Sequence, residues 1–260
     1  MTRFEGKVVL ITGAASGLGK ATALHIAREG GALSLVDLNA QGLDDVKAAI
    51  LEVAPDAQLE TITADVSKEA DVENYVAKTV ERFGKIDGFY NNAGIEGKQN
   101  LTEEYGSDEF AKVIGINLNG VFFGLKHVLK VMKEQGFGSV VNTASVGGIR
   151  GVGNQSGYAA AKHGVVGLTR NSAIEYGQFG ITINAIAPGA IMTPMVEASL
   201  KQIDPVNWEE AGTEFVSVNP AKRFGKPHEV GAVVAFLLSG EASFVNATVI
   251  PIDGGQSYKY

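Results

Sequence analysis

A tyrosine and a lysine four residues apart are the side chains in this sequence best suited to acid–base chemistry. Tyr158 and Lys162 stand in a segment with helical periodicity, and Ser145 precedes them. Positions i and i+4 share one face of a helix, with Cβ atoms about 5 to 6 Å apart, so the Lys162 ammonium is expected near the Tyr158 phenol. A nearby cation favours the phenolate and lowers the tyrosine pKa from its ordinary value of about 10. Tyr158 would then exchange protons with an alcohol or ketone. Taken alone, such a pair is more often a packed ring beside a solvated ammonium, so the rest of the chain must decide.

The elements that would position this pair alternate along the whole chain. Short apolar runs rich in β-branched residues are followed by longer amphipathic stretches, which is typical of a parallel sheet with crossover helices. We expect a single α/β domain over residues 1–260, a Rossmann-like doubly wound sheet of about seven parallel strands with helices on both faces. The expected strands are 7–11, 32–37, 59–63, 86–90, 139–142, 182–187 and 248–252. The expected helices are 17–29, 43–52, 69–83, 109–133, 157–176 and 229–238, with a helical substrate lid at about 193–220.

Composition excludes several classes of protein. The chain has 260 residues, of which 45% are hydrophobic and 20% charged, as in ordinary globular proteins. Its net charge of −7 argues against a nucleic-acid partner, because phosphate backbones are bound by clustered Lys and Arg. There are no cysteines, so disulfides and Cys-ligated zinc are excluded, and the four histidines lack metal-ligand spacing, so we predict no metal site. No signal-peptide pattern or membrane-spanning stretch is visible, and we expect a cytoplasmic protein with no membrane partner.

A glycine-rich loop follows the first expected strand and opens the first expected helix. Its glycines are spaced G-x3-G-x-G over residues 12–19. Such glycines let the backbone approach a pyrophosphate, and the helix N-terminus offers free N–H groups and a positive dipole end. We therefore predict a dinucleotide site that includes Gly13, Ser16, Gly17, Leu18 and Gly19.

Asp37 ends the second expected strand, 18 residues after Gly19. An acid about 20 residues beyond the loop binds adenosine ribose hydroxyls and repels a 2′-phosphate, so NAD+/NADH is favoured over NADP. No Arg or Lys stands beside it at Leu38 or Asn39. The alternative for Asp37 is a turn residue or helix N-cap.

Two further strands end in loops that would face the same ligand. Asp65 and Val66 follow the third expected strand, where Asp65 is equally well explained as a helix cap. The fourth strand runs into 91–94. Ligands of open α/β sheets bind along the carboxyl edge of the strands, so we add these loops to the predicted cofactor site through Asp65, Val66, Asn91, Ala93 and Gly94.

The motifs stand in one order along the chain, namely 12–19, 91–94, Asn117, Ser145, Tyr158 with Lys162, and 188–189. In this order the chain resembles the short-chain dehydrogenase/reductase family over essentially its whole length. The resemblance implies an oxidoreductase that moves a hydride between a nicotinamide and a carbonyl or secondary-alcohol carbon. It implies that Tyr158 is the general acid/base and that Ser145 binds the substrate oxygen. Lys162 would hold the nicotinamide ribose, and Asn117 would keep a water in a proton relay.

The resemblance also implies cofactor contacts at the end of the sixth expected strand. It further implies that several copies of the chain assemble into an oligomer. Pro188, Gly189, Ile191 and Thr193 correspond to the family's contacts with the nicotinamide carboxamide and the diphosphate, although Thr193 equally suits a helix cap. Family members commonly pair long helices across subunits, and we expect a homotetramer.

Within the family, three segments and the closing run 251–256 are most similar to members that reduce a cyclic diketone with NADH. These segments are 92–99, 142–158 and 185–196. A cyclic or bulky ketone, or its alcohol, is the implied small-molecule substrate. Glu96 stands out, because a carboxylate beside an apolar ketone site would bind a second substrate oxygen, although a solvated loop acid fits equally. The candidate substrate residues are Ile95, Glu96, Ser145, Val146, Val152, Gln155 and Met195.

Three other functions share part of this pattern. A 3-oxoacyl-carrier-protein reductase of the same family usually prefers NADPH and docks an acidic carrier through basic residues, which Asp37 and the negative net charge disfavour. A non-catalytic nucleotide-sensing protein with this fold would be expected to lose the serine, tyrosine or lysine. A methyltransferase that binds S-adenosylmethionine would leave Ser145, Tyr158 and Lys162 without a role.

Overall fold

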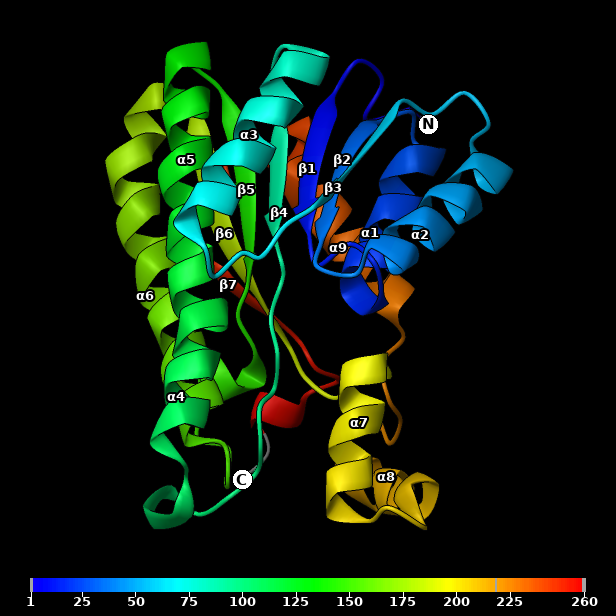
Figure 1. Ribbon diagram of the computed structural model, residues 1–260, viewed down its shortest axis with the longest axis vertical. Coiled ribbons are helices and arrows are strands. Elements are labelled where there is room, and N and C mark those ends of the chain that lie inside the picture. Colours follow the sequence, from blue (N-terminus) through cyan, green and yellow to red (C-terminus); the bar gives the residue numbers. More distant parts are fainter. Residues whose placement is uncertain (1, 218, 259–260) are drawn as a thin grey trace.

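The computed structural model describes residues 2–217 and 219–258, and its centre is one parallel sheet (Figure 1). The sheet has seven strands in the order β3-β2-β1-β4-β5-β6-β7. Strand order reverses between β1 and β4, the arrangement of a doubly wound fold, and the predicted fold class is confirmed. The strands are β1 (Val8–Thr12), β2 (Ala32–Asp37), β3 (Leu59–Thr63), β4 (Gly88–Asn91), β5 (Gly138–Thr143), β6 (Ile181–Pro188) and β7 (Val249–Ile252).

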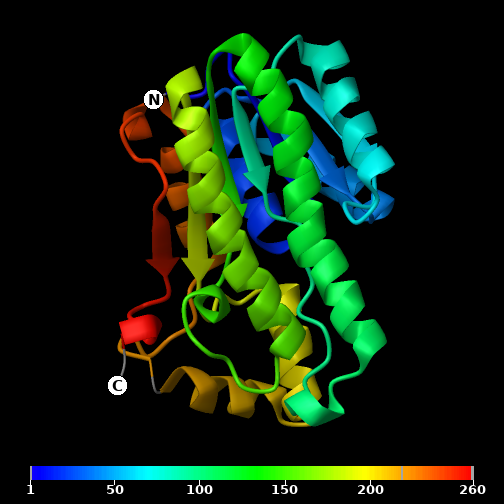
Figure 2. The same cartoon turned by 90° about the vertical axis from the view of Figure 1, so that its left-hand side faces the viewer.

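Helices cover both faces of the sheet. One layer holds α1 (Gly17–Arg28), α2 (Ala40–Val53) and α9 (Pro227–Leu238), and the other holds α3 (Glu69–Phe83), α5 (Gly120–Gln135) and α6 (Ser156–Tyr176). Figure 2 shows α5 and α6 side by side on the second face. The remaining helices, α4 (Ser107–Ile114), α7 (Pro194–Ile203) and α8 (Trp208–Ser217), extend beyond the carboxyl edge of the strands.

Strand alternation explains why both layers are needed. In β1, Val9 and Ile11 belong to the apolar core beneath α1, α2 and α9, whereas Leu10 belongs to the core beneath α3, α5 and α6. All five residues of β1 are buried. A strand buried on both faces reads as a continuous apolar run, which is how the sequence predicted it.

The long helix expected at 109–133 is interrupted. α4 leads into a widened π-helical turn (Gly115–Asn119), from which α5 continues. Such turns mark functional positions inside helices more often than chance. Asn117 lies in this turn and is fully buried, so the widening places its amide against the loop after β4.

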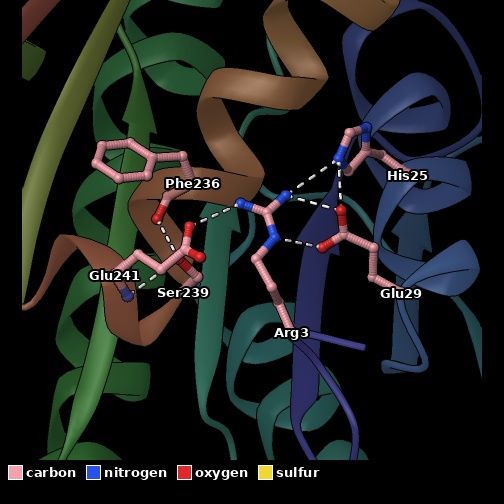
Figure 3. A network of polar contacts seen from close by, with 6 residues as sticks. All are labelled: Arg3, His25, Glu29, Phe236, Ser239 and Glu241. Atoms are coloured by element: carbon pink, nitrogen blue, oxygen red, sulfur yellow. Dashed lines mark hydrogen bonds and ion pairs between the residues drawn. The ribbon is translucent and has the colours of Figure 1, made fainter. Parts of the chain in front are cut away.

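A polar network ties the start of the chain to two helices (Figure 3). Arg3 donates to both carboxylate oxygens of Glu29, the C-cap of α1, each at 2.7 Å, and forms an ion pair with Glu241 beyond α9 at 3.2 Å. His25 joins from α1, 3.1 Å from Glu29. The guanidinium lowers the pKa of Glu29 below its ordinary value. This network fastens α1 to α9 at the end of the sheet away from α7.

None of the helices in residues 2–217 and 219–258 is long and apolar enough to cross a membrane.

Candidate active site

A cavity lies at the carboxyl edge of the sheet, where the expected cofactor loops meet. It runs from the glycine loop after β1 to Tyr158 and Lys162 on α6 and to the first turn of α7. Its lining residues are Gly13, Ser16, Gly17, Leu18, Asp37, Asn92, Ala93, Gly94, Ile95, Thr143, Ala144, Ser145, Tyr158, Lys162, Pro188, Gly189, Ile191, Thr193, Pro194, Met195 and Val196.

The glycine loop has the shape of a phosphate cradle. Gly13 has a φ of +66°, a left-handed conformation that favours glycine. A Cβ on Gly19 would collide with the Gly13 carbonyl, so α1 approaches the loop as closely as it does only because residue 19 has no side chain. The backbone therefore stays open toward the cavity at the N-terminus of α1, where a helix attracts anions.

Thr12 joins this loop to the loop after β4. Its Oγ1 accepts hydrogen bonds from the backbone N–H groups of Asn92 at 2.9 Å and Ala93 at 3.1 Å. Asn92 returns a side-chain bond to the Thr12 carbonyl at 3.0 Å. Thr12 and Asn92 thus hold the loop after β1 and the loop after β4 against each other.

The Asp37 carboxylate sits in the cavity wall and braces the loop. It accepts from Ala15 N at 3.0 Å and from Asn39 N at 2.9 Å. The α2 cap is Asn39, whose side chain accepts from Gly42 N, so Asp37 is a turn residue and not the N-cap. In the described part of the chain, Lys162 is the only Lys or Arg among the lining residues.

Tyr158 and Lys162 share one face of α6 as the spacing predicts. The Lys162 Nζ lies 5.6 Å from the centroid of the Tyr158 ring. It donates a 2.7 Å hydrogen bond to the carbonyl oxygen of Thr143, at the end of β5. The Lys162 side chain is therefore buried and anchored to the sheet, not solvated.

The pKa values of this pair correct one expectation. Burial raises the pKa of Tyr158 to about 12, while Ser145 lowers it and the charge of Glu96 raises it further. Burial also lowers the pKa of Lys162 to about 8. The expected lowering of the tyrosine pKa by Lys162 is absent in the protein alone, because loss of hydration disfavours the charged form of both groups.

Ser145 and Asn117 are held by backbone contacts. The Ser145 Oγ accepts from Gly147 N at 3.0 Å, which caps a short 3-10 turn after β5. Asn117 exchanges two bonds with Ile95, accepting from its N–H at 2.8 Å and donating to its carbonyl at 2.7 Å. Ser145 lines the cavity, and Asn117 fixes the backbone of a residue that lines it.

Several predicted residues lie outside the lining. Asn91 is buried and donates to the Val121 carbonyl at 2.9 Å, so it supports the wall from behind. Asp65 accepts from the Ser67 hydroxyl at 2.6 Å in the turn before α3. The predicted residues that do not line the cavity are Gly19, Leu38, Asp65, Val66, Asn91, Glu96, Asn117, Val146, Val152 and Gln155.

Glu96 lies beside the cavity with its carboxylate already bonded. Its Oε1 accepts from the Gln155 side chain and, at 2.7 Å, from the Ser199 hydroxyl of α7. Burial raises the pKa of Glu96, and these two donors lower it.

Five lining residues were absent from the predicted site. Thr143 ends β5 and Ala144 follows it immediately before Ser145, and Asn92 lies inside the predicted loop 91–94. The rule that ligands bind at carboxyl ends of parallel strands would have found these three. Pro194 and Val196 belong to the first turn of α7, inside the range 193–220 expected as a substrate lid, but they were not predicted as individual site residues.

The comparisons with known proteins agree with this geometry. Residues 13–257 match the family model described as Enoyl-(Acyl carrier protein) reductase. Levodione reductase of Leifsonia aquatica is 69% identical over 259 residues, which is 100% of this chain and 97% of that protein. The chain belongs to the short-chain dehydrogenase/reductase family.

Other relatives extend the likeness. The crystal structure of levodione reductase superposes with a TM-score of 0.98 at 68% identity, covering 99% of this chain and 100% of the other. Cyclohexanol dehydrogenase of Acinetobacter sp. (strain SE19) is 40% identical over 99% of this chain and 97% of that protein. NAD+-bound xylitol dehydrogenase matches with a TM-score of 0.92 at 35% identity, covering 97% and 99% of the two chains. The chain is an alcohol dehydrogenase/carbonyl reductase of this family.

Proposed function

We propose that the protein catalyses the reversible, NAD(H)-dependent reduction of a cyclic or bulky ketone to a secondary alcohol, with Tyr158 as general acid/base. The observation that carries this proposal is one continuous cavity, with the glycine loop at one end and Ser145, Tyr158 and Lys162 at the other. The cavity therefore brings the glycine loop, which suits a dinucleotide, and the side chains suited to acid–base chemistry on a carbonyl compound into one space.

The residues present fit a nicotinamide dinucleotide. The cradle formed by Gly13, Gly17 and the start of α1 suits a pyrophosphate, because the helix N-terminus attracts anions and a side chain at Gly19 would push α1 away from the loop. Asp37 suits the adenosine ribose hydroxyls. When bound, the nicotinamide supplies or accepts the hydride. The further proposed cofactor contacts in the lining are Ser16, Leu18, Ala93, Gly94, Lys162, Pro188, Gly189, Ile191 and Thr193, and those proposed from outside the lining are Leu38, Asp65, Val66 and Asn91.

In the direction of reduction, Tyr158 donates its phenolic proton to the substrate oxygen, and in oxidation it takes the proton back. Its high pKa keeps it protonated at neutral pH, which suits an acid poised for a developing alkoxide. The Ser145 hydroxyl would hydrogen-bond the same oxygen and stabilise its charge. Lys162, anchored by Thr143, would favour the phenolate left after transfer. Asn117 would hold the water that returns a proton through Lys162.

NADH is favoured over NADPH by the charges along the cavity. A 2′-phosphate beside Asp37 would place two anions together, with no Arg or Lys nearby among the described lining residues. The NAD+-bound relative supports the same choice.

A cyclic substrate is favoured by the names of two relatives and by the apolar part of the cavity. Levodione reductase and cyclohexanol dehydrogenase are both named for ring compounds. Ile95 and Met195 line the cavity near Ser145, and Val146, Val152 and Gln155 lie on the loop and turn that follow Ser145. We propose that the segment 193–220 is the lid over this ring.

Exposed apolar side chains support the proposed homotetramer. Ile174 on α6 is 79% exposed and Phe122 on α5 is 46% exposed. Contact with the helices of another subunit would remove these apolar side chains from water and so favour assembly. Light scattering at micromolar concentration should give the mass of four chains, and a monomer would contradict this part of the proposal.

The test is a panel of ketones and alcohols assayed with NAD(H) and NADP(H) in parallel. We expect turnover of cyclohexanone-type rings with NADH exceeding that with NADPH. Activity confined to a 3-oxoacyl substrate with NADPH would favour the carrier-protein reductase, which Asp37 opposes. NADH binding without turnover of any member would favour a nucleotide-sensing protein.

A further inference from the structure

The Glu96 carboxylate joins three segments of the chain. Glu96 lies in the loop after β4, Gln155 precedes α6, and Ser199 belongs to α7. The Glu96 Oε1 accepts from both partners, with 2.7 Å to the Ser199 hydroxyl. Gln99 closes the group by donating to the Ser199 Oγ at 2.8 Å. We call Glu96, Gln99, Gln155 and Ser199 the Glu96 cluster.

The helix that receives these bonds has little apolar anchorage of its own. All of α7 lies within the described residues, and Leu200 is its one buried side chain. Leu200 packs beside Gly212 of α8. Met195 and Ile203 are 39% and 57% exposed. A helix with so few buried contacts belongs to the part of a protein that opens most easily.

The position of α7 determines the shape of the cavity. Its first turn contributes Pro194, Met195 and Val196 to the lining. Two further polar contacts tie α7 to the loop after β4, namely the Gln99 bond and a Gln202 bond to the Gly97 carbonyl at 3.4 Å. Both reach residues within three positions of Glu96. Loss of the bonds in the Glu96 cluster would therefore let α7 move away from the cavity.

We propose that Glu96 is a positioning residue that holds α7 closed over the cavity, and that it does not bind the substrate itself. Its Oε1 already accepts from Gln155 and Ser199 on two other segments and, at 3.5 Å, from Gln99, and Glu96 does not line the cavity. The kinetic part of this inference rests on the proposed ketone reduction, whereas the effect on α7 does not.

A carboxylate suits this position better than a neutral acceptor. Hydrogen bonds to a charged oxygen are roughly twice as strong as those between neutral groups. Glutamine at position 96 keeps the shape and one acceptor oxygen but loses the charge, and alanine loses both. The fraction of molecules with α7 closed over the cavity should therefore fall from wild type to Glu96→Gln and again to Glu96→Ala.

The first test is cleavage by trypsin after Lys201, which lies within α7. Cleavage needs the helix to open, and its rate follows the population of the open form. Loss of the charged bonds should speed cleavage about tenfold in Glu96→Ala and Ser199→Ala, with Glu96→Gln between them and wild type. The double variant should be no faster than about twice Glu96→Ala, since the two residues act through one contact.

The matched control is Glu210→Ala, an exposed glutamate of α8. It should be cut at the wild-type rate. Wild-type cleavage rates in both Glu96→Ala and Ser199→Ala would overturn the inference, and Ser199→Ala keeps the test valid if Glu96→Ala fails to fold. No ketone is needed, so this result stands apart from the proposed function.

The second test compares cyclohexanone with a cyclohexanedione. If Glu96 acts through α7, Glu96→Ala raises KM for both ketones by a similar factor, about tenfold, and changes kcat less than about threefold. Glu96→Gln should recover part of the loss for both. A loss confined to the diketone would show direct binding of the second oxygen and would overturn the inference.

Discussion

The Lys162 Nζ lies 5.6 Å from the centroid of the Tyr158 ring and is bonded to the Thr143 carbonyl at 2.7 Å. The ammonium is therefore held by the end of β5, beside the ring. Burial raises the pKa of Tyr158 to about 12 and lowers the pKa of Lys162 to about 8. The protein alone thus keeps Tyr158 in its neutral form, ready to donate a proton.

The two directions of the reaction should respond differently to pH. Ketone reduction needs the protonated Tyr158, so kcat/KM should be level around neutral pH. Alcohol oxidation needs the phenolate, and its kcat/KM should rise as pH increases through the alkaline range. Profiles of both directions with saturating cofactor check this. An oxidation rate already maximal in mildly acidic solution would contradict it.

Replacing Lys162 by Met should stabilise the fold while removing activity. Lowering a lysine pKa from 10.5 to about 8 corresponds to about 3 kcal/mol of destabilisation at neutral pH, which the apolar isostere avoids. Between pH 8 and pH 10.5 the unfolded wild type still binds the proton that the folded state has lost. Wild-type stability therefore rises with pH in that window.

Urea unfolding of wild type and Lys162→Met on both sides of that window measures this effect. The stability gap should be constant below pH 8 and should shrink above it. A variant less stable than wild type at neutral pH would show that the Thr143 bond outweighs the cost of burial.

Replacing Asp37 by Ser should relax the choice of cofactor. The NADPH-to-NADH ratio of kcat/KM should rise about tenfold or more, or about 1.4 kcal/mol, because an anion beside the 2′-phosphate position is removed. Asp44→Ser, at an exposed position of α2, is the control and should keep the wild-type ratio. An unchanged ratio in Asp37→Ser would separate Asp37 from cofactor selection.

The network around Arg3 should contribute to stability without affecting catalysis. The side chains of Arg3 and Glu29 are only 18% and 19% exposed, so Arg3→Met should cost about 2 kcal/mol at unchanged kcat. Since the Glu29 pKa is lowered, the contribution is present at neutral pH and is lost as pH falls through that pKa.

The control for the Arg3 network is a solvent-exposed ion pair. Lys126 and Glu69 are 53% and 40% exposed, and Lys126→Met should change stability far less than Arg3→Met, because water screens an exposed pair. Equal losses in the two variants would show that burial of the Arg3 pair has no effect.

Local patterns were enough to predict the elements that carry strong periodicity. The strands 32–37 and 59–63 and the helix 69–83 match the structure at both ends, because buried strands and amphipathic helices differ in period. The helix 109–133 was predicted without its π-helical turn at Gly115–Asn119. That turn contains Asn117, whose two bonds with Ile95 are a contact between distant segments that no local pattern contains.

The same limit applies to the site. The spacing of Tyr158 and Lys162 predicted their shared helix face, but the anchor on Thr143 and the burial that sets both pKa values arise from packing against β5. Glu96 was predicted as a substrate residue from its place beside the loop 91–94. Its bond to Ser199 depends on where α7 lies in the fold, and Ser199 is 103 residues further along the chain.

The turnover of Tyr158→Phe with NADH and cyclohexanone tests whether Tyr158 is the acid/base of ketone reduction. Loss of the phenolic oxygen should lower kcat by about a factor of a hundred or more, while NADH affinity from fluorescence titration should change less than about threefold. A variant that binds NADH normally and keeps a substantial part of wild-type turnover would contradict the account.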